Sequence, residues 1–100
     1  MTLSIVLALL SIASAPSCAP VASGKEFLVP TEQAAIAAAR LAWKGKFSPA
    51  AINEREPYHA ELVDGTWHVT GTLPAGWRGG TPEALICAAD GKVLKVFHTQ

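Results

Sequence analysis

Two Asp-Gly pairs constrain the fold of this chain more than any other feature. Asp64-Gly65 and Asp90-Gly91 each lie between runs of residues that favour strands. An Asp-Gly pair in that setting is the strongest local signal for a two-residue hairpin turn, in which the backbone takes positive φ angles. The sequence therefore predicts two antiparallel hairpins, residues 58–63 with 66–73 and residues 83–89 with 92–98.

The turn at Asp64-Gly65 also predicts which residues of the first hairpin share a face, because side chains alternate between the two faces of a sheet. One face is apolar and suited to burial, and consists of Tyr58, Ala60, Leu62, Trp67, Val69 and Leu73. The other face is polar and carries His59, Glu61, His68 and Thr70. Glu61 and His68 are expected to lie directly opposite each other as a weak cross-strand pair.

The second hairpin is expected to be apolar on both faces. A two-residue turn at Asp90-Gly91 places Leu85, Cys87, Leu94 and Val96 on one face and Ala84, Ile86, Val93 and Phe97 on the other. One helix cannot cover both faces of a four-stranded sheet. Part of this surface is therefore expected to remain open or to contact a partner.

A helix is predicted ahead of the hairpins. Thr31 can cap its first turn, where Glu32 places an acid at the positive end of the helix dipole. Residues 33–43 are rich in Ala and Leu, and Gly45 and Pro49 are expected to end the helix. Its core-facing side is expected to hold Ile36, Ala39, Arg40, Trp43 and Phe47. The predicted fold class is therefore α+β, with one N-terminal helix packed on a four-stranded antiparallel sheet of two hairpins.

The first 24 residues differ from the rest, since every Lys, Arg, Asp and Glu lies from Lys25 onward. Residues 3–15 form an apolar run of thirteen, whereas a membrane-spanning helix needs about 20 residues. This length is typical of a signal peptide, although no Lys or Arg precedes the run. We therefore divide the chain into a signal peptide and linker, residues 1–24, and one α+β domain, residues 25–100, and expect export.

The end of the leader is left open between three positions. Small residues at Ala13-Ser14-Ala15 suit a signal peptidase, but Pro16 would follow the cut, and Ala22-Ser23-Gly24 fits better. Residues 15–18, Ala-Pro-Ser-Cys, resemble a bacterial lipobox except at Ala15 and Pro16, which would make Cys18 a lipid attachment site. The protein is thus expected to be periplasmic or an envelope-anchored lipoprotein.

Cys18 and Cys87 are the only two cysteines. They can form a disulfide only if the leader is cut before Cys18 and no lipid is added, and Cys87 is otherwise expected to be a small buried residue on a strand. The eight basic and eight acidic side chains balance. This balance argues against nucleic acid or an anionic membrane as the main partner, so a lipid on Cys18 is the only membrane contact expected.

Partner binding is the expected use of the surface, because no catalytic, cofactor or metal site is predicted. The chain has no Gly-x-Ser-x-Gly motif, and its histidines do not follow a metal-ligand spacing. The connection over residues 74–82 contains Trp77 and Arg78, two residue types that dominate binding hot spots. The alternative is that Trp77 folds back on the core. The candidate partner-binding residues are Trp77, Arg78, His59, Glu61 and His68.

The order of several motifs adds a family resemblance. Arg55-Glu56-Pro57-Tyr58 is followed by Asp-Gly-Thr-Trp-His-Val-Thr-Gly-Thr-Leu-Pro at residues 64–74, then by Gly79-Gly80, Pro82-Glu83-Ala84 and Asp90-Gly91-Lys92-Val93-Leu94. Over residues 30–98 this order resembles the nuclear-transport-factor-2-fold immunity proteins of bacterial polymorphic toxin systems. The resemblance implies a cystatin-like helix on a curved sheet that neutralises a toxin by protein–protein binding, with no cofactor and no reaction of its own. A leader and a domain this short depart from the family pattern.

Two other functions remain open. A PepSY-like envelope protein that restrains a protease also combines a helix with hairpins ending in Asp-Gly-Lys-Val, but that alternative leaves Gly79-Gly80 unexplained. The second alternative is a small envelope protein of another role, either a lipoprotein or an enzyme or metal carrier. Stoichiometric zinc or an activity that depends on His68 would indicate the enzyme or carrier.

Overall fold

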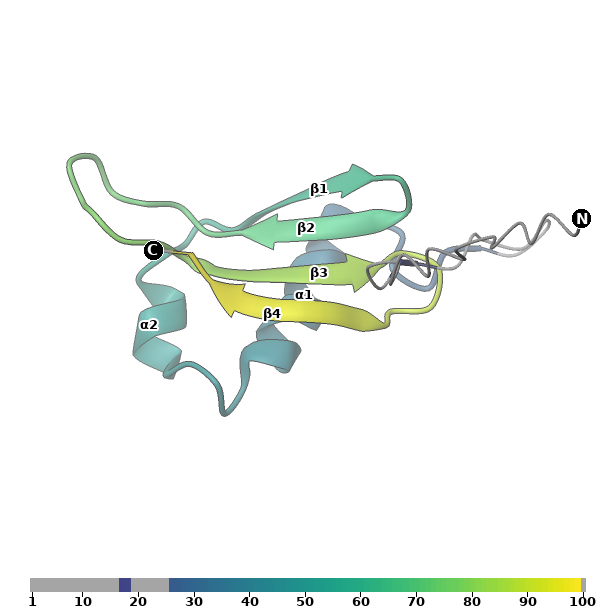
Figure 1. The fold of residues 1–100 in the computed structure, drawn as a ribbon, viewed down its shortest axis with the longest axis horizontal. Coiled ribbons are helices and arrows are strands. Elements are labelled where there is room, and N and C mark those ends of the chain that lie inside the picture. The colour runs from purple at the N-terminus through teal and green to yellow at the C-terminus, as the bar shows by residue number, and fades with distance from the viewer. Residues whose placement is uncertain (1–16, 19–25, 100) are drawn as a thin grey trace, which may run out of the picture.

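The computed structural model describes residues 17–18 and 26–99. Along the chain these form α1 (Glu32–Trp43), α2 (Pro49–Asn53), β1 (His59–Val63), β2 (Thr66–Thr70), β3 (Pro82–Cys87) and β4 (Val93–His98). The strands make one antiparallel sheet in the order β1-β2-β3-β4, and α1 packs on one face of it (Figure 1). The predicted α+β class is confirmed. Apart from residues 17–18, the predicted leader lies outside the described residues.

Helix α1 begins where the sequence predicts. The Thr31 hydroxyl accepts a hydrogen bond from the Ala34 backbone N–H at 3.1 Å, which caps the first turn. Ala35, Ala39 and Trp43 are the buried residues of the helix. Two of these three are alanines, so the helix backbone can approach the sheet closely, and Trp43 fills the space at its C-terminal end.

Helix α2 is an addition to the predicted fold, in which Pro49 only ends the first helix. The Ser48 hydroxyl accepts from the Ala51 backbone N–H at 3.1 Å, and Pro49 occupies the first turn, where its missing N–H costs nothing. Ile52 is the buried residue of this helix. The short helix turns the chain back toward the sheet.

The first hairpin has the predicted register. Asp64 and Gly65 have φ angles of 49° and 76°, and Glu61 pairs with His68 as Leu62 pairs with Trp67. Within the expected apolar face, Tyr58, Trp67 and Val69 are buried and Ala60 is half-buried, but Leu62 and Leu73 are exposed. Leu62 lies at the end of the edge strand and Leu73 lies beyond β2, so α1 covers neither.

The second hairpin differs from the prediction. Its connection spans residues 88–92, and the pairing of β3 with β4 shifts between Leu85 and Ile86. The backbone of Ala88 is already engaged, because its carbonyl accepts from Val29 N–H at 2.9 Å and its N–H donates to the Gly65 carbonyl at 2.9 Å. Those bonds lie on the β2 side of β3. On the β4 side the Cys87 N–H donates to the Lys92 carbonyl at 2.8 Å and the Cys87 carbonyl accepts from the Gly91 N–H at 2.9 Å, which closes the hairpin.

This shift changes the faces of the second hairpin. Val96 pairs with Ala84 and faces α1, whereas Lys95 pairs with Leu85 and Phe97 pairs with Glu83 on the opposite face. The expectation that Val96 shares a face with Leu85 is therefore wrong. The face away from α1, which we call the open face, is less apolar than expected because it carries Glu83 and Lys95.

The sheet has two dissimilar ends. One, the turn end, holds the Asp64-Gly65 turn and residues 88–92; the other, the loop end, holds the long connection of residues 71–81 (Figure 1). The core lies between α1 and the sheet and consists of Val29, Ala35, Ala39, Trp43, Ile52, Tyr58, Trp67, Val69, Ala84, Ile86 and Ala88. Within the described residues, neither helix has the length and apolar character needed to cross a membrane.

Candidate partner-binding surface

The loop of residues 71–81 projects beyond the sheet (Figure 1). Trp77 is 61% exposed, so the alternative in which it packs into the core is wrong. The Arg55 guanidinium carbon lies 5.6 Å from the centre of the Trp77 ring, within the range of a cation–π contact. Arg55 also donates from Nε to the Gly80 carbonyl at 3.1 Å. The indole thus lies against a side chain that is itself fixed to the base of the loop.

The base of this loop is fixed by backbone contacts. Thr81 is buried; its N–H donates to the Thr99 hydroxyl at 3.1 Å, and its own hydroxyl accepts from the Gly71 N–H at 3.1 Å. A Cβ added at Gly80 would overlap the Thr99 carbonyl. Gly80 therefore has a steric role, since only a residue without a side chain lets Thr99 pass here, whereas Gly79 meets no atom but takes a φ of 121° that favours glycine.

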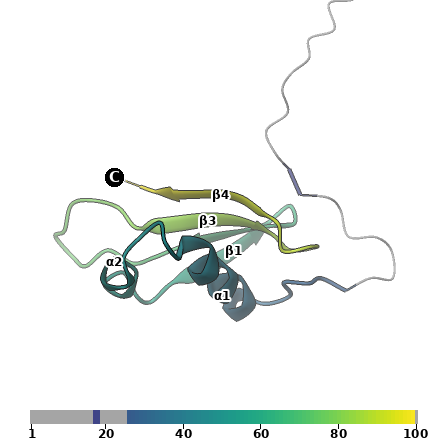
Figure 2. The ribbon, with the colours of Figure 1, turned by 90° about the horizontal axis from the view of Figure 1, so that it is seen from below.

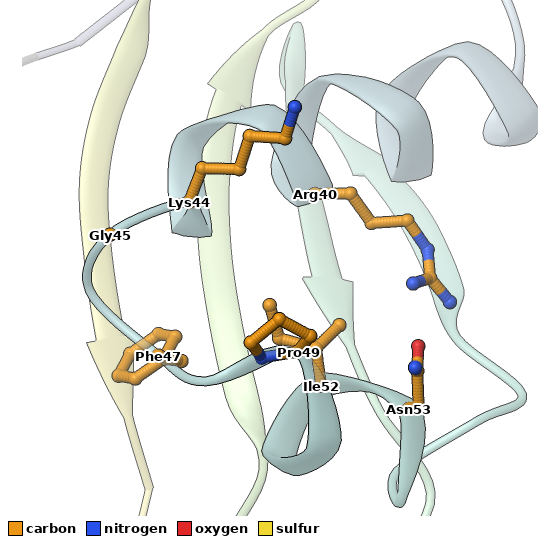
Figure 3. Close-up of a pocket in the computed structure, with 7 residues that line it drawn as sticks. All are labelled: Arg40, Lys44, Gly45, Phe47, Pro49, Ile52 and Asn53. Carbon is orange, nitrogen blue, oxygen red and sulfur yellow. The ribbon is translucent and has the colours of Figure 1, made fainter.

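A hollow of about 320 Å³ lies between the C-terminal end of α1 and α2, on the α1 side of the loop end (Figure 3). Phe47, Pro49 and Ile52 line it from below, and Arg40 and Lys44 approach it from α1 (Figure 3). Its lining also includes Gly45 and Asn53. An apolar floor beside Lys44, with Arg40 already paired to Glu56, suits an apolar side chain that is followed by a carboxylate.

Tyr58 and Glu56 contact residues that line this hollow. The Tyr58 hydroxyl donates to the Ile52 carbonyl at 2.7 Å, and Arg40 forms an ion pair with Glu56 while its guanidinium carbon lies 5.1 Å from the Tyr58 ring centre. Burial raises the pKa of Tyr58, and the nearby Arg40 charge opposes that shift only in part. The phenol is therefore neutral at physiological pH and acts as a hydrogen-bond donor.

The open face carries a polar cluster centred on Glu83, which is only 4% exposed. His68 Nε2 lies 2.6 Å from Glu83 Oε1, and the Thr70 hydroxyl donates to the same oxygen at 3.3 Å. The His68 ring stacks at 6.3 Å on Phe97, and Lys95 Nζ lies 4.7 Å from the Phe97 ring centre. Glu61 is the cross-strand neighbour of His68, as expected, but the His68 ring contacts the Glu83 carboxylate.

The structure separates the candidate residues into two groups. His59, Glu61 and His68 share the open face, and His59 and Glu61 are exposed. Trp77 and Arg78 lie in the exposed loop beyond the sheet. Cys18 lies at the turn end, where it forms a disulfide with Cys87.

Two parts of this surface were not anticipated from the sequence. Glu83 and Phe97 meet only because β3 and β4 pair as they do, so nothing local marks them. The hollow depends on α2, for which Ser48-Pro49 was a readable signal, because Ser favours the N-cap and Pro the first helical position. Within residues 17–18 and 26–99, no three His, Cys, Asp or Glu side chains are placed to hold a metal ion together.

The comparisons with known proteins agree with this arrangement of one core-covering helix and a sheet. A family model described as NTF2 fold immunity protein matches residues 34–100, which include most of α1 and all four strands. No curated protein and no solved structure matches the chain. On the strength of that match over two thirds of its length, this chain belongs to the NTF2-fold immunity protein family.

Proposed function

We propose that this protein neutralises a bacterial protein toxin by binding it directly, and that it does so after export, in the periplasm or at the envelope. The family match over residues 34–100 carries the proposal. Neutralisation of this kind needs only that the toxin be occupied, so no reaction is assigned to the chain. The predicted signal peptide, residues 1–24, supports export.

The toxin-contacting surface is assigned to the loop end. Trp77 is the most exposed aromatic side chain among the large exposed apolar residues, and Arg55 orders it from beneath. A preordered aromatic side chain loses little conformational entropy on binding, which is why Trp and Arg dominate hot spots. Arg78 beside it adds a charge, and His59 lies on the open face at the end of β1 nearest the loop, with His68 further along the same face on β2.

The experiment starts from a bait whose first native residue is Ser17, exported behind a heterologous signal peptide with a tag ahead of Ser17. The bait is incubated with the envelope and secreted fractions of producing cells, and captured polypeptides are identified by mass spectrometry. A captured polypeptide is then produced on its own for calorimetric titration and for a growth assay in which the immunity chain is co-expressed.

We expect stoichiometric binding and protection of growth, both weakened by Trp77→Ala and Arg78→Ala. Leu41→Ala is the matched control, because Leu41 is 67% exposed on α1 and lies outside the assigned surface. Protection without measurable binding would contradict direct neutralisation. Equal effects of Leu41→Ala and Trp77→Ala would contradict the assignment to the loop end.

A further inference from the structure

The disulfide fixes Cys18 to the open face of the sheet. Cys87 is the last residue of β3, is 1% exposed, and alternates with Ile86, which faces the core. Cys18 Sγ also lies 3.2 Å from the hydroxyl of Thr66, the β2 residue opposite Cys87. Residues 17–18 accordingly lie on the side of the sheet away from α1 (Figure 2).

The chain is fixed to the same end of the sheet again at Leu28 and Val29. Leu28 and Val29 donate from their backbone N–H groups to the carbonyls of Ala89 and Ala88, at 3.2 and 2.9 Å. The Val29 carbonyl in turn accepts from Trp67 Nε1 at 2.8 Å. The covalent bond at Cys18 and this hydrogen-bonded stretch therefore both belong to the folded domain at its turn end.

Lipidation, the bond to Cys87 and removal with the leader are mutually exclusive fates of Cys18. A divalent sulfur bonded to Cβ has one further bond to make, so a lipid thioether and the bond to Cys87 exclude each other. A cut after Ala22-Ser23-Gly24 would remove Cys18 altogether. The domain observed here needs Cys18 to be retained and unlipidated.

We propose that the mature exported protein is cut upstream of Cys18 and carries the Cys18–Cys87 disulfide in place of a lipid. This inference rests on the export stated under the proposed function. Residues 11–13, Ser-Ile-Ala, offer small residues at the −3 and −1 positions of a cut, and the first mature residue would then be Ser14, with no proline at that position. The apolar run left upstream, residues 3–10, still has the length of a signal-peptide core.

Oxidation in the envelope closes the bond. The two thiols lose two protons and two electrons as one S–S bond forms, and a disulfide of an envelope oxidant accepts both and is released as a dithiol. The Cα atoms of Cys18 and Cys87 are 5.2 Å apart, within the usual range for a disulfide. Such bonds persist in oxidising compartments, where small domains use them to supplement a small core.

The test is the intact mass of the natural chain, expressed with its own leader and purified from the envelope fraction without reductant. We expect a mature chain that starts upstream of Cys18, takes up no alkylating reagent before reduction and takes up two alkyl groups after it. Cys18→Ala is the matched variant, because an upstream cut does not require Cys18 whereas lipoprotein processing does. This variant is expected to be exported and cut at the same position.

Three results would overturn the proposal. They are a diacylglyceryl mass on Cys18, uncut precursor accumulating in Cys18→Ala, and a mature chain that starts at Lys25. A leader-bearing chain with two free thiols in the cytoplasm would overturn both this proposal and export. Protection against the toxin is scored separately in the same strains, so a disulfide-bonded chain that fails to protect would contradict toxin binding alone.

Discussion

Replacing Trp43 tests the packing of α1 on the sheet most directly. Its side chain is 0% exposed, is the largest fully buried side chain, and lies 4.9 Å from the Tyr58 ring between centroids. Its indole N–H donates to the Glu83 carbonyl at 3.0 Å. Trp43→Ala therefore removes a large apolar volume and a buried hydrogen bond at once.

The expected cost follows from these contacts. Truncating a buried aromatic side chain to Ala lowers the free energy of unfolding by about 3–5 kcal/mol. A domain of this size has a total stability of about 4–11 kcal/mol, so Trp43→Ala removes a large part of it. Trp43→Phe keeps most of the ring volume but leaves the Glu83 carbonyl without its indole donor. This loss should lower the free energy of unfolding by about 1–3 kcal/mol.

The assay is urea unfolding of the disulfide-bonded protein, followed by circular dichroism at 222 nm so that loss of a fluorophore does not matter. Trp77→Ala is the control and should change the free energy of unfolding by less than about 0.5 kcal/mol, because Trp77 is mostly exposed. If Trp43→Ala proves too unstable to purify, Trp43→Phe carries the test. The packing argument fails if either Trp43 variant is no less stable than Trp77→Ala.

The other predictions concern the loop end and its surroundings. Trp77→Ala should weaken toxin binding by at least about 2 kcal/mol, roughly 30-fold in Kd, in calorimetric titration; a smaller loss would move the contact elsewhere. Gly80→Ala should lower the midpoint of thermal unfolding, because the new Cβ meets the Thr99 carbonyl. Gly80 has no positive φ, whereas Gly76 has a φ of 81° and meets no atom, so Gly76→Ala measures backbone strain alone and a larger loss in Gly80→Ala reports the clash. Burial raises the pKa of Tyr58 above its ordinary value of 10.0, so its contribution to folding is complete below pH 10 and is lost as the pH rises through the folded pKa. Unfolding of Tyr58→Phe should accordingly be less sensitive to pH above 10 than that of the natural protein, and identical pH profiles would contradict this.

The features predicted correctly from the sequence depend on neighbours along the chain. The Thr31 cap and the Asp64-Gly65 turn each involve residues within a few positions of one another. The turn then sets which residues of the two strands lie opposite each other, such as Glu61 and His68. Sequence patterns of this kind report local backbone preferences directly.

The features predicted wrongly depend on details beyond the turn motif itself. Asp90-Gly91 carries the same turn signal, but here only Gly91 takes a positive φ, and the Cys87 carbonyl accepts from the Gly91 N–H at 2.9 Å, so the hairpin closes over a longer connection. The pairing of β2 with β3, in which Glu83 lies opposite Thr70, brought Glu83 beside His68, which no local pattern could indicate. The exposed Trp77 was foreseen as one of two outcomes, and only the packing of Arg55 and Gly80 decides between them.

The two dissimilar ends of the sheet also determine how this protein can be joined to other molecules. Cys18 enters at the turn end, whereas Thr99 hydrogen-bonds to Thr81 at the base of the loop. A fusion partner or affinity tag at the C-terminus would thus stand beside Trp77 and compete with a toxin for space. An N-terminal attachment leaves that surface clear, so export signals and anchors can be exchanged at this end without redesigning the binding surface.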